Sequence, residues 1–194
     1  MKMLRQLSLI KHSFQSALLL ILAFAIAPLT SSQTPATAPP GDAAVHQSAD
    51  ALLKEMTLEE KIGQLSQLFD FGKSKEIDDA VAKGELGSLL FVTDPAETNR
   101  LQHLAVDKTR LHIPLIFGFD VIHGFRTIFP VPIAMAASWD PAAAVKAQTI
   151  AAKEARSVGI DWAFAPMLDI ARDPRWGRIV EGAGEDPYLS LIHI

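Results

Sequence analysis

Three short apolar runs constrain the fold of this chain more than any other feature. They cover residues 87–92, 114–119 and 161–165, and turn residues bound them. Short runs that are apolar throughout are typical of strands buried on both faces, as in a parallel sheet covered by helices. Helical patterns separate the runs, and such alternation produces an α/β fold. We therefore expect an α/β domain built on a parallel sheet.

The segments around these runs carry helix start and stop signals. A capping box at Thr57 and Glu60 opens one helix. The apolar residues after it follow one helical stripe: Leu58, Ile62, Leu65 and Phe69. The other predicted helices are a short one that Ser48 could cap, 74–83 closed by Gly84, 95–111, and 142–158 between an Asp140 cap and Gly159.

The first 32 residues predict a signal peptide. They hold three basic residues and no acid, and residues 17–27 form an unbroken apolar run. Such a run suits a signal-peptide core, whereas a membrane-spanning helix needs about 20 apolar residues. An uncleaved membrane anchor is the alternative. Residues 33–47 start with a stretch rich in proline and alanine and predict an extended linker. We expect an exported protein with no stable membrane span after cleavage.

Composition argues against several partners and chemistries. The net charge is −4 overall and −7 over residues 33–194. A nucleic-acid-binding surface is expected to be basic, so we expect no nucleic-acid partner. The sequence has no cysteine, which excludes a disulfide framework, a thiolate zinc site and a cysteine nucleophile.

Two parallel-sheet architectures fit this alternation, the open doubly wound sheet and the closed (β/α)8 barrel. The chain lacks the glycine-rich phosphate motifs of nucleotide-binding sheets. Polar residues closely follow two of the three runs, as functional residues follow barrel strands. We favour the barrel. A complete barrel needs about 250 residues. Because only 147 residues follow residue 47, we expect an incomplete, TIM-like barrel.

The first candidate cluster is Asp120 with His123, directly after the second run. A carboxylate at the end of a buried strand is poorly solvated, so it needs a protein donor or a ligand hydroxyl as partner. A metal pair would need a third ligand at a recognisable spacing, and we find none, so no metal is expected. His123 by itself is expected to orient the loop rather than to act as a base.

The second candidate cluster is the arginine-rich segment 172–178, which runs on to Glu181 and Glu185. One interpretation is an ion-pair network that pins a long loop, and the other is the wall of a polar pocket. An arginine fork and a tryptophan face suit a sugar, whereas the acids would repel a phosphate. A glycosidase needs two converging carboxyl groups. The candidates are Asp120, Asp169, Glu181 and Glu185, and sequence separation leaves their convergence open.

Four segments in order resemble glycoside hydrolase family 3, especially the exported β-glucosidases of Gram-negative bacteria. They are MTLEEKIGQ at 56–64, FDVIHG at 119–124, TIFP at 127–130 and RDPRWGR at 172–178. The resemblance implies that residues 48–189 are part of a first (β/α)8-type barrel domain. It also implies retaining hydrolysis of terminal non-reducing β-glucosyl residues from β-glucosides or oligosaccharides, through a covalent glycosyl-enzyme and without a cofactor. The implied location is the periplasm, with an extracellular location as the alternative.

The resemblance also implies roles for individual residues. Asp120 and Arg178 match the residues that bind glucose hydroxyls in the −1 subsite. The residues expected to shape and support that pocket are His123, Asp169, Arg172, Asp173, Arg175 and Trp176. The family's nucleophile and acid/base have no matching position, so they are expected beyond residue 194 and this chain alone is expected to be inactive. Residues 190–194 depart from the family pattern.

Other functions remain open on the same scaffold. A β-xylosidase or a β-N-acetylhexosaminidase could use the same barrel, and an inactive glycan-binding remnant is a further alternative.

Overall fold

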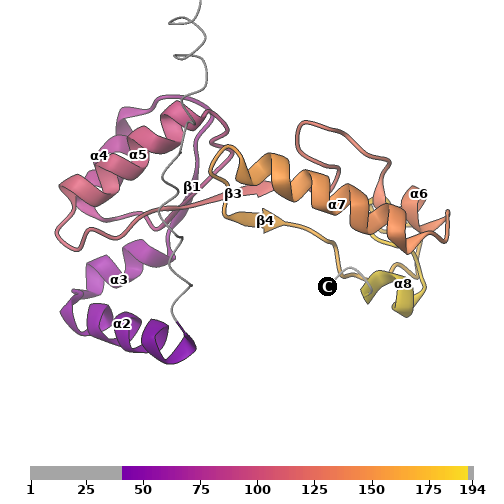
Figure 1. Cartoon of the computed structure of the whole chain (residues 1–194), viewed down its shortest axis with the longest axis horizontal. Coiled ribbons are helices and arrows are strands. Elements are labelled where there is room, and N and C mark those ends of the chain that lie inside the picture. Colours follow the sequence, from indigo (N-terminus) through magenta and orange to yellow (C-terminus); the bar gives the residue numbers. More distant parts are fainter. Residues whose placement is uncertain (1–40, 192–194) are drawn as a thin grey trace, which may run out of the picture. The chain divides into compact units, whose positions relative to one another are not determined.

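A computed structural model describes residues 41–191 of the chain, in which helices and strands alternate. The expected signal peptide, the first part of the expected linker and residues 192–194 lie outside the described residues. None of the helices within 41–191 is long and apolar enough to cross a membrane. The elements, most of which are labelled in Figure 1, are α2 Asp42–Glu55, α3 Leu58–Leu65, β1 Gln67–Phe69, α4 Lys75–Lys83, β2 Ser88–Leu90, α5 Pro95–Lys108, β3 Ile116–Asp120, α6 Pro132–Ala136, α7 Pro141–Arg156, β4 Trp162–Phe164, the 3-10 turn η1 Ile179–Glu181 and α8 Pro187–Leu191.

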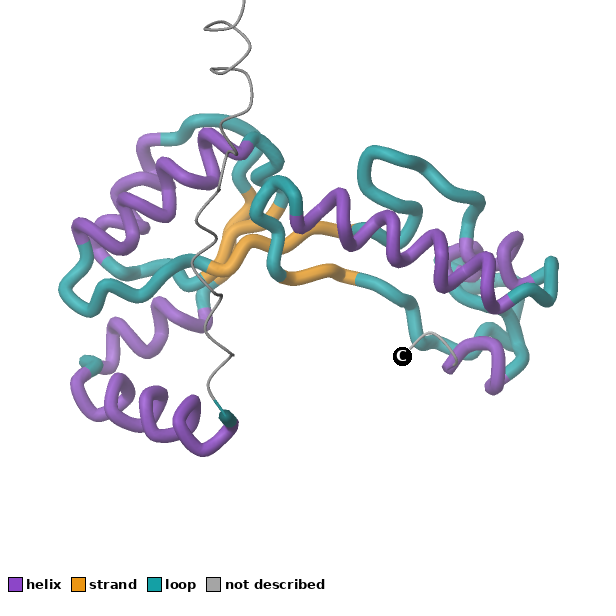
Figure 2. Tube along the Cα trace, in the orientation of Figure 1, coloured by secondary structure: helices purple, strands orange, loops and turns teal. Residues whose placement is uncertain are grey.

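The described strands form one parallel sheet in the order β1-β2-β3-β4, and Figure 2 shows them side by side. Each strand therefore pairs with its neighbour in the sequence. This is the order of consecutive barrel strands, whereas a doubly wound sheet reverses its order at a switch point. Within residues 41–191 the sheet is not closed, because β1 and β4 are its edges. The predicted α/β class and incomplete barrel are confirmed.

One hydrophobic core lies between the sheet and the helices α4 and α5. Leu89 of β2 and Phe117 of β3 are opposite each other in the register and are fully buried. The predicted apolar face of α5 covers them through Leu101 and Ala105, which are also buried. A second cluster joins α7 to the end of β3 and contains Val121, Ala151, Ala155, Val158 and Ile160.

Most of the predicted helix ends are confirmed. Thr57 and Glu60 exchange the two hydrogen bonds of a capping box, at 3.2 and 2.9 Å. Asp140 accepts hydrogen bonds from the first backbone N–H groups of α7. Gly84 and Gly159 follow α4 and α7 in the left-handed conformation, with φ of 74° and 92°, which a residue with a Cβ rarely adopts.

Two expectations are wrong. The stripe predicted to run to Phe69 stops at Leu65, where α3 ends, and the next residues form β1. Pairing with β2 overrides the helical spacing there. In addition, α2 begins at Asp42, so residues 42–47 are helical rather than extended and Ser48 lies inside the helix. The prolines of the expected linker all precede Asp42, and proline is what most strongly opposes a helix.

Two short helices, α6 and α8, differ from the sequence-based expectations. The short helix α6 was not expected from the sequence. The first two residues of the expected atypical tail, Ser190 and Leu191, belong to α8.

Candidate functional site

A cavity of about 400 Å³ opens at the carboxyl ends of the strands β2, β3 and β4. In barrel proteins this edge of the sheet carries the functional residues. The wall combines apolar side chains with two acids and one arginine: Leu90, Phe91, Asp120, Ile122, Phe164, Ala165, Pro166, Met167, Arg178 and Glu181. The structure thus brings Asp120 and Arg178, which lie in different predicted clusters, to the same cavity.

Asp120 is the last residue of β3, and its side chain is held in a defined position. Its Oδ1 accepts a hydrogen bond from the Ile122 backbone N–H at 2.9 Å. This is an Asx turn, which fixes the carboxylate relative to the strand end. Two residues earlier, a Cβ on Gly118 would lie 2.7 Å from Leu90 Cδ2 and 2.8 Å from Phe164 Cε2. Glycine at this position therefore lets both apolar side chains reach the cavity wall.

Arg178 faces the cavity in an ion pair with Glu181. Its Nε lies 3.0 Å from Glu181 Oε1 and its Nη2 lies 2.6 Å from Oε2. These hydrogen bonds lower the pKa of Glu181 and raise that of Arg178, and the negative charges of Asp120 and Asp169 raise the Arg178 pKa further. Glu181 is therefore a carboxylate that orients the arginine, and it is poorly suited to donate a proton.

The remaining loop residues take a more local role. Asp173 and Arg175 pair with each other, with Arg175 Nε 3.0 Å from Asp173 Oδ1, and both side chains are exposed. Arg172, Trp176 and this pair lie outside the wall of the cavity. Asp169 is also outside the wall, but its charge acts on Arg178. The second predicted cluster is therefore divided: Arg178 and Glu181 line the cavity, whereas Asp173 and Arg175 form an ion pair away from it.

His123 belongs to the loop that follows Asp120. Its backbone oxygen accepts a hydrogen bond from Phe129 N at 2.9 Å, which closes the loop. Its Nδ1 is buried and has no hydrogen-bond partner among the described residues. Within residues 41–191, no group of three or more His, Asp or Glu side chains is arranged to hold a metal ion.

Sequence reasoning missed Phe91 and Met167 of the cavity wall. Phe91 follows β2 with φ of 69°, and no residue pattern signals a left-handed phenylalanine. Met167 follows the third apolar run, so proximity to a strand end was the one available signal.

The parallel β/α sheet with consecutive strands defines a barrel-type domain. The partly apolar cavity at its carboxyl edge, with carboxylates and an arginine in the wall, is a candidate site for a polar ligand. Residues 57–192 match the glycosyl hydrolase family 3 N terminal domain, and the chain belongs to this family.

Relatives of the chain are considerably longer proteins. It is 40% identical over 144 residues to the periplasmic beta-glucosidase of Salmonella typhimurium, an alignment that covers 73% of this chain and 19% of the relative. It is 31% identical over 169 residues to a putative beta-xylosidase of Formosa agariphila, an alignment that covers 75% of this chain and 22% of the relative. The crystal structure of a beta-glucosidase from Listeria innocua in complex with isofagomine superposes on this chain with a TM-score of 0.67 and 37% sequence identity. The superposition covers 76% of this chain and 21% of the beta-glucosidase. The chain thus spans about a fifth of the length of these relatives.

Proposed function

We propose that the chain forms part of the glucose-binding subsite of a retaining β-glucosidase. The observation that carries the proposal is the cavity that Asp120 and Arg178 share at the carboxyl edge of the sheet. The identities to the β-glucosidases of Salmonella typhimurium and Listeria innocua support it. The activity itself belongs to a protein of the relatives' length.

The proposed subsite recognises glucose through its hydroxyl groups. The Asp120 carboxylate accepts hydrogen bonds from hydroxyls, and the Arg178 guanidinium, held by Glu181, donates to them. Charged partners make such hydrogen bonds about twice as strong as neutral ones. His123 and Asp169 support this pair from the adjoining loops, and residues 172–176 stabilise the loop that carries Arg178.

Retaining hydrolysis needs a nucleophile and an acid/base whose carboxyl groups are about 5–5.5 Å apart. We assign both to residues outside this sequence, because the family's nucleophile segment has no counterpart in it. The chain by itself should therefore bind glucosides without cleaving them. Release of 4-nitrophenol from 4-nitrophenyl β-D-glucoside by the purified chain, at a rate that Asp120→Asn lowers, would contradict this assignment.

Binding of methyl β-D-glucoside, followed by NMR titration, tests the subsite. Asp120→Asn keeps an oxygen that can accept from Ile122 N–H, so it preserves the Asx turn while it removes the charge. A hydrogen bond to a charged group contributes about 1.5–3 kcal/mol, so affinity should fall about 10- to 100-fold. Asp79→Asn, on the exposed surface of α4, is the control and should leave the affinity unchanged. Equal affinities of the two variants would refute the role of Asp120.

A β-xylosidase is the second candidate, because the relative from Formosa agariphila carries that description. Xylose lacks the hydroxymethyl group of glucose. A chain that binds methyl β-D-xyloside more tightly than methyl β-D-glucoside would favour this alternative.

We further propose that the protein is exported to the periplasm. The basic and apolar pattern of residues 1–32 and the periplasmic relative support this location. Residues 1–45 fused to a reporter that is active only after export should yield activity. Leu20→Arg, within the apolar run, should abolish the activity, whereas Ala36→Arg should not.

A further inference from the structure

One carboxylate of α7 fastens the loop that follows Asp120. Residues 121–131, which we call the β3 loop, connect β3 to α6 and run beside α7 (Figure 1). Glu154 Oε2 accepts hydrogen bonds from the backbone N–H groups of Arg126 and Thr127, at 2.9 and 2.8 Å. Its Oε1 accepts from the Thr127 hydroxyl at 2.6 Å. Both oxygens of this carboxylate are therefore engaged by the β3 loop.

The position of Glu154 on its helix favours a role toward the loop. It lies in the last turn of α7, where the partial negative charge of the helix end disfavours a carboxylate. The hydrogen bonds from the β3 loop offset this cost, and a charged acceptor makes them strong. The neighbouring Ala151 and Ala155 are buried in a cluster that also contains Val121, and Phe125 packs against it. This face of α7 thus gives the loop an apolar contact and a directional, charged one.

The β3 loop is folded tightly enough to carry the position of Thr127 to the cavity. Gly124 is buried and forms bridges with both Ile122 and Ile128. A Cβ on Gly124 would collide with the Thr127 carbonyl oxygen, so the two sides of the loop touch at the backbone. Because close-packed groups transmit a displacement to their neighbours, movement of Thr127 also moves Ile122.

Ile122 connects the loop to the carboxylate of the proposed glucose subsite. Its N–H donates to Asp120 Oδ1 at 2.9 Å, and it lines the cavity together with Asp120. The direction of the Asp120 carboxylate therefore depends on where the Ile122 backbone lies. Hydrogen bonds weaken steeply as their angle departs from linearity, so a small rotation of this carboxylate weakens its bonds to a sugar.

We propose that Glu154 is a positioning residue for Asp120, because it holds the β3 loop in the form that aims the Asp120 carboxylate at the glucose hydroxyls. The inference rests on the proposed function, since Asp120 must be a group that binds the sugar. Glu154 is not part of the cavity wall, so it acts on the glucoside through the loop alone.

A double-mutant cycle on the affinity for methyl β-D-glucoside, measured by NMR titration of the chain, tests this inference. Glu154→Ala removes all three hydrogen bonds and should lower the affinity about 3- to 10-fold. Glu154→Gln keeps an oxygen for the N–H groups and offers an amide donor to the Thr127 hydroxyl. Its bonds are neutral and weaker, so its loss should be about 2- to 3-fold. In the Asp120→Asn background neither substitution should change the affinity, because the charged acceptor that Glu154 positions is already absent.

Glu60→Ala is the matched control. The Glu60 carboxylate also accepts from a backbone N–H, that of Thr57, and pairs with Arg110, but it lies outside the cavity wall. Its removal should leave the affinity unchanged. The amide resonance of Ile122 gives an independent readout, since it should shift in Glu154→Ala and stay in place in Glu60→Ala.

The outcomes separate this inference from the proposed function. If Asp120→Asn lowers the affinity but Glu154→Ala does not, the inference is overturned and the proposed function stands. An equal loss from Glu154→Ala in both backgrounds also overturns it, because a merely structural role weakens binding regardless of Asp120. If Asp120→Asn leaves the affinity unchanged, both fail. Should Glu154→Ala not fold, Glu154→Gln decides: a loss confined to the parent background supports the inference, and no loss or an equal loss refutes it.

Discussion

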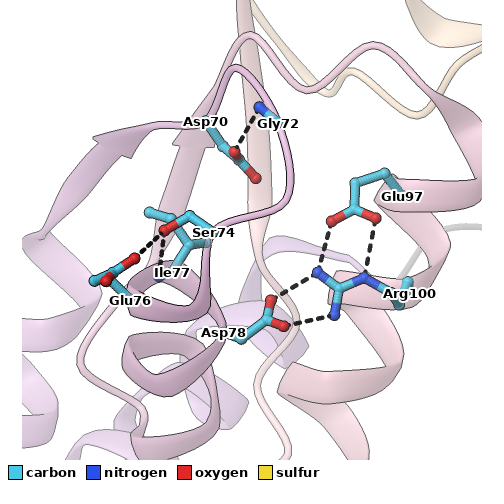
Figure 3. Close-up of polar contacts among 8 residues, drawn as sticks. All are labelled: Asp70, Gly72, Ser74, Glu76, Ile77, Asp78, Glu97 and Arg100. Carbon is cyan, nitrogen blue, oxygen red and sulfur yellow. Dashed lines mark hydrogen bonds and ion pairs between the residues drawn. The ribbon is translucent and has the colours of Figure 1, made fainter.

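Arg100→Met should destabilise the packing of α5 on α4. Arg100 donates to Asp78 of α4 and to Glu97 of its own helix, each with one contact of 2.6 Å (Figure 3). The Glu97 side chain is only 9% exposed. Removal of the arginine therefore leaves a buried carboxylate without its two donors.

The expected loss follows from the burial of the three groups. Removing one partner of a buried ion pair lowers the free energy of unfolding by about 3–5 kcal/mol. Arg100 and Asp78 are 37% and 38% exposed, so water replaces part of their interaction. We therefore expect a loss of about 2–4 kcal/mol in the free energy of unfolding. In Arg100→Met/Glu97→Leu the stranded charge is absent, and at least about 1 kcal/mol should be recovered.

Urea unfolding at pH 7, followed by tryptophan fluorescence, measures these differences. Lys75→Met is the matched control, because it breaks the exposed pair with Asp79 on α4 and should have no measurable effect. The reasoning is refuted if Arg100→Met is no more destabilising than Lys75→Met, or if the double variant is less stable than Arg100→Met alone.

The pH dependence of stability gives an independent check on the same pair. The hydrogen bonds from Arg100 lower the pKa of Glu97 from its ordinary value of 4.5. A carboxyl group whose pKa is lower in the folded state stabilises the fold above the unfolded pKa. This contribution is lost as the pH falls through the folded pKa. In Arg100→Met the unpaired carboxylate favours protonation, so acidification should cost this variant less stability than it costs the parent chain.

Two further substitutions test local geometry. Gly63→Ala should lower the free energy of unfolding by about 1–3 kcal/mol, because its Cβ would lie 2.3 Å from Gly84 O. This clash should outweigh the preference of alanine for helices. Thermal unfolding checks the loss, with Gly72→Ala as the control because a Cβ there meets open space. Glu154→Gln should reduce amide-exchange protection at Thr127, whose N–H donates to the Glu154 carboxylate at 2.8 Å. Hydrogen bonds from the Thr127 hydroxyl and from the Thr127 and Arg126 N–H groups lower the Glu154 pKa. The protection factor in the parent chain should therefore also fall as the pH drops through this lowered pKa, and a pH-independent factor would contradict the assignment.

Local signals explain why much of the fold was predictable. The box at Thr57, the cap at Asp140 and the turn at Gly84 each act within a few residues, so the sequence alone contains the whole interaction. By contrast, β1 has three residues and forms because it pairs with β2. Its apolar residues also fit a helical spacing, and no local signal distinguishes the two interpretations.

The residues of the candidate site also include some that the sequence predicts and some that only the fold reveals. Asp120 was predictable because it follows an apolar run, and Arg178 because it ends a segment that resembles the family pattern. Their meeting at one cavity depends on strand order and on the path of the loop after β4. The positions of Phe91 and Glu181 depend on a left-handed residue and a 3-10 turn. Neither conformation has a reliable residue pattern.

The sheet register connects the fold to the proposed function. Phe69, Leu90, Gly118 and Trp162 are successive partners across the four described strands, so they form one row on one face of the sheet. Phe69 and Trp162 are exposed in this row, whereas side chains on the inner face of a closed barrel are packed in layers. Asp120 lies two residues beyond Gly118 and therefore belongs to the same face. Strands that pair with the edges β1 and β4 would bury these rings and bring their own carboxyl ends around Asp120. Under the proposed function, that is where retaining hydrolysis requires its two carboxyl groups, so closure of the barrel and assembly of the active site would depend on the same strands.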